Sequence, residues 1–207
     1  MNLSQIEWPT NVEVRTVTLE SLRDSHFDEL GAICRHPEIW EHTLVSLLDA
    51  DDFQRWFTNI RALGDEKKVF PFAVRLTSTN KVVGHTALVG IDVEQDNATI
   101  AWTWLVPHVW GTSVSVELRL GLLRFAFDKL RAKRVEAKLD NLNERNKRLF
   151  VRLGANFEGC HLQYQYRRVS GGRRDAAVFS FLARDWPILS CNIERLVDER
   201  LQRQKLK

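Results

Sequence analysis

Long apolar runs are missing from the 207-residue chain, which has nothing near the roughly 18 consecutive apolar residues of a membrane-spanning helix. The first ten residues lack a basic stretch followed by an apolar block, so we expect no secretory leader and a cytoplasmic location. The three cysteines, Cys34, Cys160 and Cys191, are far apart and form no CxxC pair, which argues against a zinc site or a disulfide framework. We therefore expect a single globular domain, at most with an appendage, and no bound metal.

Net charge is also small, at +3, and does not by itself indicate a nucleic-acid-binding protein. The positive charge is uneven, however, because ten lysines and arginines lie between residues 124 and 152 and four arginines lie between residues 167 and 174. Such clusters are typical of solvated helix faces and turns, but they also suit a polyanionic ligand, either nucleic acid or the phosphates of a nucleotide. Composition alone leaves both interpretations open.

Hydrophobic periodicity and turn residues predict a mixture of helices and strands. Gly64 and Gly154 are expected to end two of the helices. The predicted helices cover residues 19–35, 37–42, 51–63, 116–130, 143–153 and, as a charged helix or frayed tail, 193–207. The predicted strands cover residues 12–17, 70–77, 82–91, 98–106, 134–139, 163–169 and 175–183. This order predicts a mixed α/β domain.

One connection has the length of a βαβ crossover, running from the strand at 98–106 through a helix to the strand at 134–139. Its loop, residues 108–117, is small and polar, and Gly111 lies just ahead of a strongly amphipathic helix. Unpaired N–H groups at a helix start carry partial positive charge, so an anion would bind here. Many such loops contain Gly, Ser and Thr only as helix caps, so the loop alone does not decide the function.

Several segments, taken in order, resemble the motifs of one enzyme family. The run Ile100–Leu105 with Trp110-Gly111-Thr112 is similar to the central motif of the GNAT acyltransferases, and closest to the RimJ/RimL-like branch related to ribosomal-protein N-terminal acetyltransferases. Later segments that also fit are residues 140–148, 153–159, 174–180 and 185–187. The resemblance implies a GNAT domain over residues 1–187, followed by a charged C-terminal helix or tail over residues 188–207.

That resemblance also implies a fold and a cofactor. The implied fold is α/β (α+β), with a twisted mixed sheet flanked by helices and a splayed gap between two central strands that receives acetyl-CoA. The backbone of Leu105 and Val106 is implied to pair with the pantetheine arm. Asn143 is implied to hydrogen-bond the cofactor, and Asn146 to lie near its thiol. The loop implied to wrap the pyrophosphate consists of Trp110, Gly111, Thr112, Ser113, Val114 and Ser115.

The acceptor side of the implied site is less clearly marked. Residues 36–42 resemble the substrate-side helix of the branch, where Trp40 and a carboxylate, Glu41 or Glu38, are candidates to contact the amine. Trp102 on the central strand is a further candidate. Aromatic residues at helical spacing are more often core, so Trp40 has that alternative role. Arg145 and Arg148 also have two alternative roles: they could bind the 3′-phosphate of CoA, or they could be solvated surface residues.

Acetyl transfer needs an unprotonated amine, and the sequence does not identify a single base. The catalytic candidates are His85, Glu94, Asn146 and Tyr164, together with Asp92, Glu136 and a water relay. His85 lies in an apolar strand, so we favour a structural role for it over a catalytic one. Asp92 and Glu94 lie in a turn, where acidic residues are common for turn formation alone. The family often has a tyrosine acid where Phe150 stands here.

We therefore expect an N-acetyltransferase that moves acetyl from acetyl-CoA to a primary amine by direct attack in a ternary complex. The acceptor is expected to be a protein N-terminal α-amine or a small molecule, and the protein a monomer or homodimer without a membrane partner. Departures from the family pattern at Thr99, Ser113, Asn146 and Phe150 motivate an alternative, a CoA-binding module without catalysis. A third hypothesis, suggested by the basic clusters, is an RNA- or ribosome-binding protein.

Overall fold

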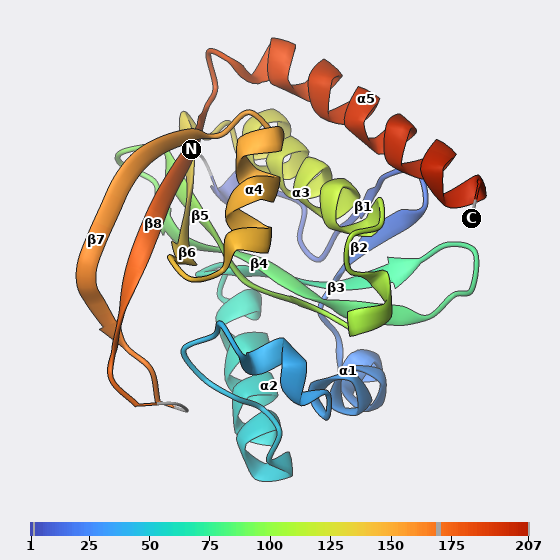
Figure 1. Cartoon of the computed structure of the whole chain (residues 1–207), viewed down its shortest axis with the longest axis vertical. Helices are drawn as coiled ribbons and strands as arrows, with labels where there is room; N and C mark the ends of the chain where they lie inside the picture. Colours follow the sequence, from blue (N-terminus) through green and yellow to red (C-terminus); the bar gives the residue numbers. More distant parts are fainter. Residues whose placement is uncertain (2, 169–170, 207) are drawn as a thin grey trace.

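A mixed sheet of eight strands organises the chain, whose residues 1, 3–168 and 171–206 are described by the computed structural model (Figure 1). The strands are β1 (Asn11–Glu13), β2 (Val17–Ser21), β3 (Phe70–Leu76), β4 (Val82–Asp92), β5 (Asn97–Leu105), β6 (Arg134–Asp140), β7 (Asn156–Tyr166) and β8 (Arg173–Leu182). The helices are α1 (Phe27–Cys34), α2 (Ala50–Asp65), α3 (Val114–Arg124), α4 (Glu144–Arg152) and α5 (Trp186–Lys205). This mixed architecture confirms the predicted fold class.

Strand order across the sheet is β1-β2-β3-β4-β5-β6-β8-β7. Every neighbouring pair is antiparallel except β5 and β6, which are parallel. The connection between these two strands runs through α3, as the predicted βαβ crossover requires. The parallel pair therefore lies at the centre of the sheet, between two antiparallel blocks.

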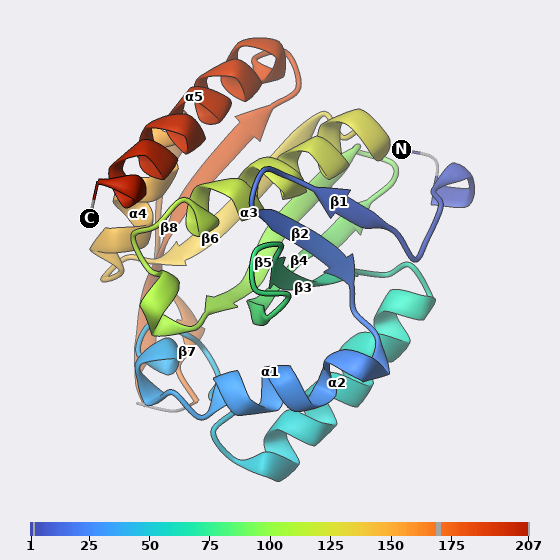
Figure 2. The ribbon, with the colours of Figure 1, turned by 90° about the vertical axis from the view of Figure 1, so that its right-hand side faces the viewer.

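Helices cover both faces of the sheet. Figure 2 shows α1 and α2 on one face, and α3 and α5 on the other. The crossover helix α3 is buried almost all round, because α5 covers the side that faces away from the sheet. No helix in the described part of the chain is both long and apolar enough to cross a bilayer.

Local sequence explains the start and the packing of α2. The Asp49 carboxylate caps the helix by accepting hydrogen bonds from the N–H groups of Asp51 and Asp52, at 2.9 and 3.0 Å. Phe53, Phe57 and Ile60 follow at steps of four and three and are all buried. Gly64 was expected to end the helix but lies inside it, where a Cβ would come within 3.1 Å of the Pro71 ring. That glycine is explained by close packing rather than by a helix cap.

The predicted helix over residues 19–35 is wrong in its first third. Residues 17–21 form β2, which pairs with β3 and buries every second residue, and only Phe27–Cys34 is α-helical. The predicted strand over residues 12–17 is likewise two strands, because the chain turns between β1 and β2 with Val14 N–H donating to the Val17 carbonyl at 2.9 Å. Pairing with β3 overrides the local helical pattern.

Two further boundaries differ from the sequence prediction. The predicted helix over residues 116–130 is α-helical only to Arg124 and continues as a π-helix from Phe125 to Lys129. The predicted strand over residues 163–169 is the end of a longer strand, β7, whose alternation is broken by register shifts near Gly159 and Gln163. Val169 and Lys207, which end two predicted elements, lie outside the described residues.

The C-terminal segment is an ordered helix that packs on the sheet-covering helix α3. Ile193 and Val197 are buried on that side of α5. Two ion pairs add to the packing: Glu194 with Arg124 at 2.5 Å, and Asp198 with Arg15 at 2.7 Å. The predicted charged helix is therefore a packed element that begins at Trp186.

Candidate active site

The central parallel strands separate soon after they pair. Their ladder joins only residues 97–99 of β5 to residues 134–136 of β6. Farther along, β5 bulges against β4, and Trp102 adopts a left-handed φ of 51°. A cavity of about 1190 Å³ opens on this gap and is lined from β5, β6, α3 and α4. It is large enough for a long, extended ligand.

The predicted phosphate loop forms one end of this cavity. Trp110, Gly111 and Ser115 line it directly. Ser113 and Val114 are buried behind the loop. Ser113 has φ −62°, so the serine carries none of the strain that a left-handed conformation would impose. Gly111 does adopt a left-handed φ, 76°, and its Cβ position is open space.

Side chains within the loop fix its shape. The Thr112 hydroxyl donates to the Val109 carbonyl at 2.6 Å. The Trp110 indole N–H donates to the Leu105 carbonyl at 2.8 Å. Val106 has partners for both its backbone groups, since its N–H donates to Val83 and its carbonyl accepts from Val109. The predicted pantetheine contacts at Leu105 and Val106 would therefore replace or share bonds that the chain already makes.

The loop and α4 meet across the mouth of the cavity. The Arg145 guanidinium stacks on the Trp110 ring, 3.9 Å from its centroid. Partial burial lowers the pKa of Arg145, and the charge of Glu41 opposes that effect. Arg145 therefore holds Trp110 in place, which is a role additional to the phosphate contact or surface solvation predicted for it.

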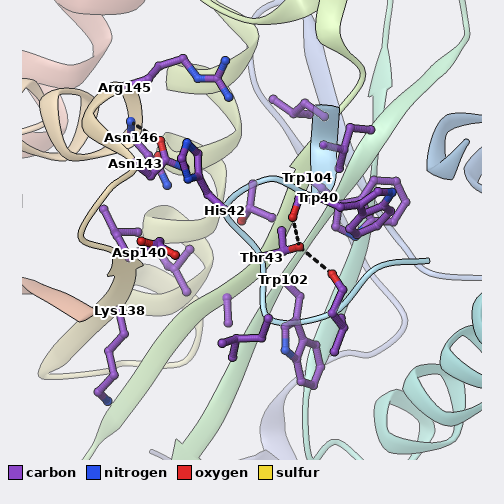
Figure 3. A pocket seen from close by; sticks show the side chains of 18 of the residues that line it. Trp40, His42, Thr43, Trp102, Trp104, Lys138, Asp140, Asn143, Arg145 and Asn146 are labelled. Carbon is purple, nitrogen blue, oxygen red and sulfur yellow. Dashed lines mark hydrogen bonds between the residues drawn. The ribbon is translucent and has the colours of Figure 1, made fainter. Parts of the chain in front are cut away.

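Three polar residues line the cavity where α3 faces α4 (Figure 3 shows the two asparagines). The Asn143 side chain caps α4 by accepting from the Asn146 N–H at 3.0 Å. The Asn146 side-chain oxygen accepts from an Arg119 N–H at 3.0 Å. Since arginine only donates, this bond leaves the amide N–H groups of Asn146 for other partners.

Arg119 was not predicted as a site residue, because the sequence does not distinguish it from an exposed arginine on a helix. Its side chain is buried, with 5% of the residue exposed, and burial lowers its pKa to about 10. Its other hydrogen bond goes to the Ser115 carbonyl at 3.0 Å, and its Nε has no partner. Within the described chain it forms no ion pair with a carboxylate. A buried, uncompensated cation at a cavity wall suits an anionic or strongly polar ligand.

The structure places His85 away from the cavity. It is fully buried between Trp56 and Trp104, and its Nδ1–H donates to the Trp102 carbonyl at 2.9 Å. Burial lowers its pKa to about 4, against a hydrogen bond to Trp102 that acts in the opposite direction. His85 therefore supports the β5 bulge, and it does not line the space where an amine would lie.

Three of the other proton-transfer candidates also lie away from the cavity. Asp92 and Glu94 lie at the β4–β5 turn, where the Asp92 carboxylate accepts from the Glu94 N–H at 3.0 Å. Glu136 pairs with Lys138 and Arg134; despite partial burial, these hydrogen bonds lower its pKa. Of the predicted catalytic candidates, Asn146 and Tyr164 line the cavity.

One residue that the sequence reasoning missed does line the cavity. His42 is partly exposed and follows the short 3₁₀ helix Pro37–Trp40. Among the described residues it is the one histidine in the cavity wall. The sequence signal was its place at the end of the segment that resembles the substrate-side helix.

The predicted acceptor residues fall into three different settings. Trp102 lines the cavity with 44% of its surface exposed. Trp40 also reaches the wall (Figure 3) but is otherwise core. Its indole N–H donates to the Cys34 carbonyl at 2.9 Å. Glu41 is exposed and does not line the cavity, whereas Glu38 does. Glu38 is therefore the better-placed carboxylate.

Comparison with known proteins identifies the family. Residues 16–156 match the model of the acetyltransferase (GNAT) domain, which is more than half of the chain. The chain belongs to the GNAT acetyltransferase family. The family and the acyltransferase class that its motifs suggested are thereby confirmed.

Individual GNAT relatives agree with this assignment. The uncharacterized N-acetyltransferase p20 of Bacillus licheniformis is 25% identical over 170 residues, covering 80% of this chain and 94% of that protein. A GCN5-related N-acetyltransferase from Brucella melitensis is 26% identical with a TM-score of 0.82, covering 91% of this chain and 85% of that one. Mycobacterium smegmatis RimJ, solved in complex with CoA-disulfide, is 20% identical with a TM-score of 0.78, covering 93% and 96%. At that identity the likeness to RimJ shows the fold.

Proposed function

We propose that this GNAT protein transfers acetyl from acetyl-CoA to a protein N-terminal α-amine, by direct attack while both substrates are bound. The observation that carries the proposal is the cavity between the splayed strands, which runs from the Trp110–Ser115 loop at α3 past Trp102 on β5. The loop offers helix N-terminal N–H groups for the pyrophosphate, and Asn146 offers amide N–H groups beyond it. The solved RimJ complex supports a ligand of the CoA type in this fold.

We choose an α-amine as the acceptor because few side chains that line the cavity can accept a proton. An α-amino group has a pKa near 8, so about a tenth is unprotonated at neutral pH, whereas a lysine amine needs a much stronger base. His42 is the residue we assign to take a proton from the ammonium group of the acceptor, which leaves the free amine that attacks the thioester. The similarity to RimJ, an enzyme of the branch that the motifs suggested, supports the same acceptor class.

Attack forms the C–N bond, breaks the thioester C–S bond and leaves CoA as a thiol that needs one proton. Phe150, which is buried against Phe179 and Phe181, has no hydroxyl to give. The departing thiolate is therefore stabilised by the Asn146 amide and the buried Arg119 charge and takes its proton from water. The oxyanion is held by backbone N–H groups of the β5 edge that β6 does not pair.

A CoA-binding module without catalysis is the second candidate, favoured by the missing hydroxyl at Phe150. The two functions differ in a simple assay. The enzyme releases free thiol when acetyl-CoA and an N-terminal peptide are supplied together, and the module binds acetyl-CoA without releasing thiol above the rate of hydrolysis. A panel of peptides with different first residues makes a negative result informative.

The experiment that tests the binding site is calorimetric titration with acetyl-CoA. Gly111→Glu adds a carboxylate at the phosphate loop, and we expect it to abolish micromolar binding. Gly172→Glu is the matched control, because Gly172 also has a left-handed φ, 73°, and open space at its Cβ position but does not line the cavity. Binding that is absent in the unmodified protein, or equally weakened by both substitutions, would refute the proposed site.

A further inference from the structure

The C-terminal helix touches the phosphate loop although it lies beyond the family match at residues 16–156. The Gln204 side-chain oxygen accepts from the Ser113 N–H at 3.0 Å. The Arg200 guanidinium donates to the Gly111 carbonyl. Figure 2 shows the end of α5 near the loop that leads into α3. Two side chains of α5, one turn apart, are therefore bonded to the loop that the proposed function assigns to pyrophosphate.

The packing of α5 sets where these side chains lie. Val197, one turn before Arg200, is fully buried against α3, and Asp198 is paired with Arg15. The buried Val197 and the paired Asp198 fix the position of the helix, and its last two turns therefore lie next to the loop. Their position is therefore a consequence of the fold, and not of the two loop contacts alone.

Arginines gather where α5 passes α4. A second cavity, of about 460 Å³, lies between these helices and is lined by Arg152, Arg195, Arg200 and Arg203 together with Glu199. Arg152 and Arg200 also line the large cavity, so the two spaces adjoin.

The charge in this second cavity is poorly compensated. Partial burial, followed by the charges of Arg152 and Arg203, lowers the pKa of Arg200. None of these three arginines forms an ion pair within the described chain, and Glu199 pairs with none of them. Like charges held close together without a carboxylate are stabilised by a bound anion.

We propose that the last two turns of α5 form part of the coenzyme site: Arg152, Arg200 and Arg203 bind the ribose 3′-phosphate of CoA, and Gln204 caps the Ser113 N–H until the pyrophosphate replaces it. A phosphate monoester carries nearly two negative charges and takes bidentate bonds from guanidinium groups. The loop next to the cluster takes the second phosphate group of the same ligand. The inference rests on the proposed function, because it presumes CoA in the large cavity.

The test compares CoA with 3′-dephospho-CoA, which lacks only the phosphate in question, by calorimetry on the full chain. We expect the unmodified protein to bind CoA about tenfold to a hundredfold more tightly, as for hydrogen bonds to a charged group. Arg203→Ala should weaken CoA binding and leave 3′-dephospho-CoA binding unchanged, whereas Arg200→Ala, which also removes the bond to the Gly111 carbonyl, should weaken CoA binding by the larger factor. Arg184→Ala, which removes an exposed arginine that lines neither cavity, should change neither affinity.

Gln204→Ala gives an independent readout with the opposite sign. It removes the side chain that competes for the Ser113 N–H, so both ligands should bind about twofold to fivefold more tightly, as for one neutral hydrogen bond. All of these variants are at exposed or partly exposed positions, so we expect each of them to fold. Thermal unfolding of each variant checks that it does.

Different failures separate the two proposals. If neither ligand binds the unmodified protein, both the proposed function and this inference fall. If both bind equally, or if Arg200→Ala weakens both by the same factor, the coenzyme site stands and the 3′-phosphate assignment is refuted. Salt-sensitive binding of a short RNA that saturating CoA does not displace would assign these arginines to nucleic acid and refute the inference.

Discussion

Acid should destabilise the protein through His85, and the structure sets the size of the effect. His85 is fully buried, and burial lowers its pKa from 6.5 to about 4. Between these two pH values the unfolded chain binds more protons than the folded chain. The contribution of His85 to the free energy of unfolding is therefore fully present above pH 6.5 and is lost as the pH falls toward 4. Between pH 7 and pH 5 this one group lowers the free energy of unfolding by about 2 kcal/mol.

The assay is urea unfolding at pH 7 and pH 5, compared between the unmodified protein and His85→Asn. Asparagine keeps a donor for the Trp102 carbonyl but does not titrate. The variant should be less stable at pH 7, because it leaves a space between Trp56 and Trp104, and it should lose about 2 kcal/mol less on acidification. The difference in slope isolates His85 from other groups such as His26, whose pKa burial also lowers.

Equal pH dependence in the two proteins would refute the argument, because it would mean that His85 titrates alike in the folded and unfolded chain. A second result would also refute the argument: His85→Asn removes an acid sensitivity of the activity without changing the stability. That result would restore His85 as a proton carrier in the reaction.

Three further predictions concern other buried or cavity-lining groups. Glu117→Gln should lower the free energy of unfolding by about 2 kcal/mol in urea titrations, because the buried carboxylate accepts both from the Thr16 N–H and from its hydroxyl, each at 2.7 Å. Arg119→Met should change stability by no more than about 1 kcal/mol, since lost hydrogen bonds offset a burial penalty of about 3 kcal/mol, while kcat for thiol release falls at least about tenfold. His42→Gln should lower kcat for thiol release about a hundredfold. An Asn146→Ser variant that keeps full activity would contradict the role given to the Arg119 charge and its amide partner.

Much of the fold could be predicted from the sequence because its central part obeys simple patterns. The hairpin of β3 and β4, the β5–α3–β6 crossover and the amphipathic face of α2 all follow from alternation, helical spacing and turn residues. The errors fall at the N-terminal edge and at β7. There, pairing with β3 or bulges near Gly159 decide the conformation, and neither is a property of the local sequence.

The site divides in a similar way. Gly111 and Asn143 were singled out from the sequence because a resemblance to family motifs marks individual positions, and both line the cavity. Arg119 and His42 were not, since nothing local distinguishes an arginine or histidine that lines a cavity from one in water. The separation of His85 from the cavity depends on which face of β4 packs against Trp56 and Trp104, which only the tertiary structure shows.

Several groups assigned to the coenzyme already have partners in the free chain. The Ser113 N–H is capped by Gln204, the Leu105 carbonyl by Trp110, and the Val106 N–H by Val83. Binding therefore exchanges one set of hydrogen bonds for another, and neutral exchanges of this kind add little net affinity. The groups without a carboxylate partner differ, because a ligand phosphate relieves repulsion that the free protein must bear. Affinity for the coenzyme should consequently depend more on the arginines than on the loop hydrogen bonds, and it should fall steeply as ionic strength rises.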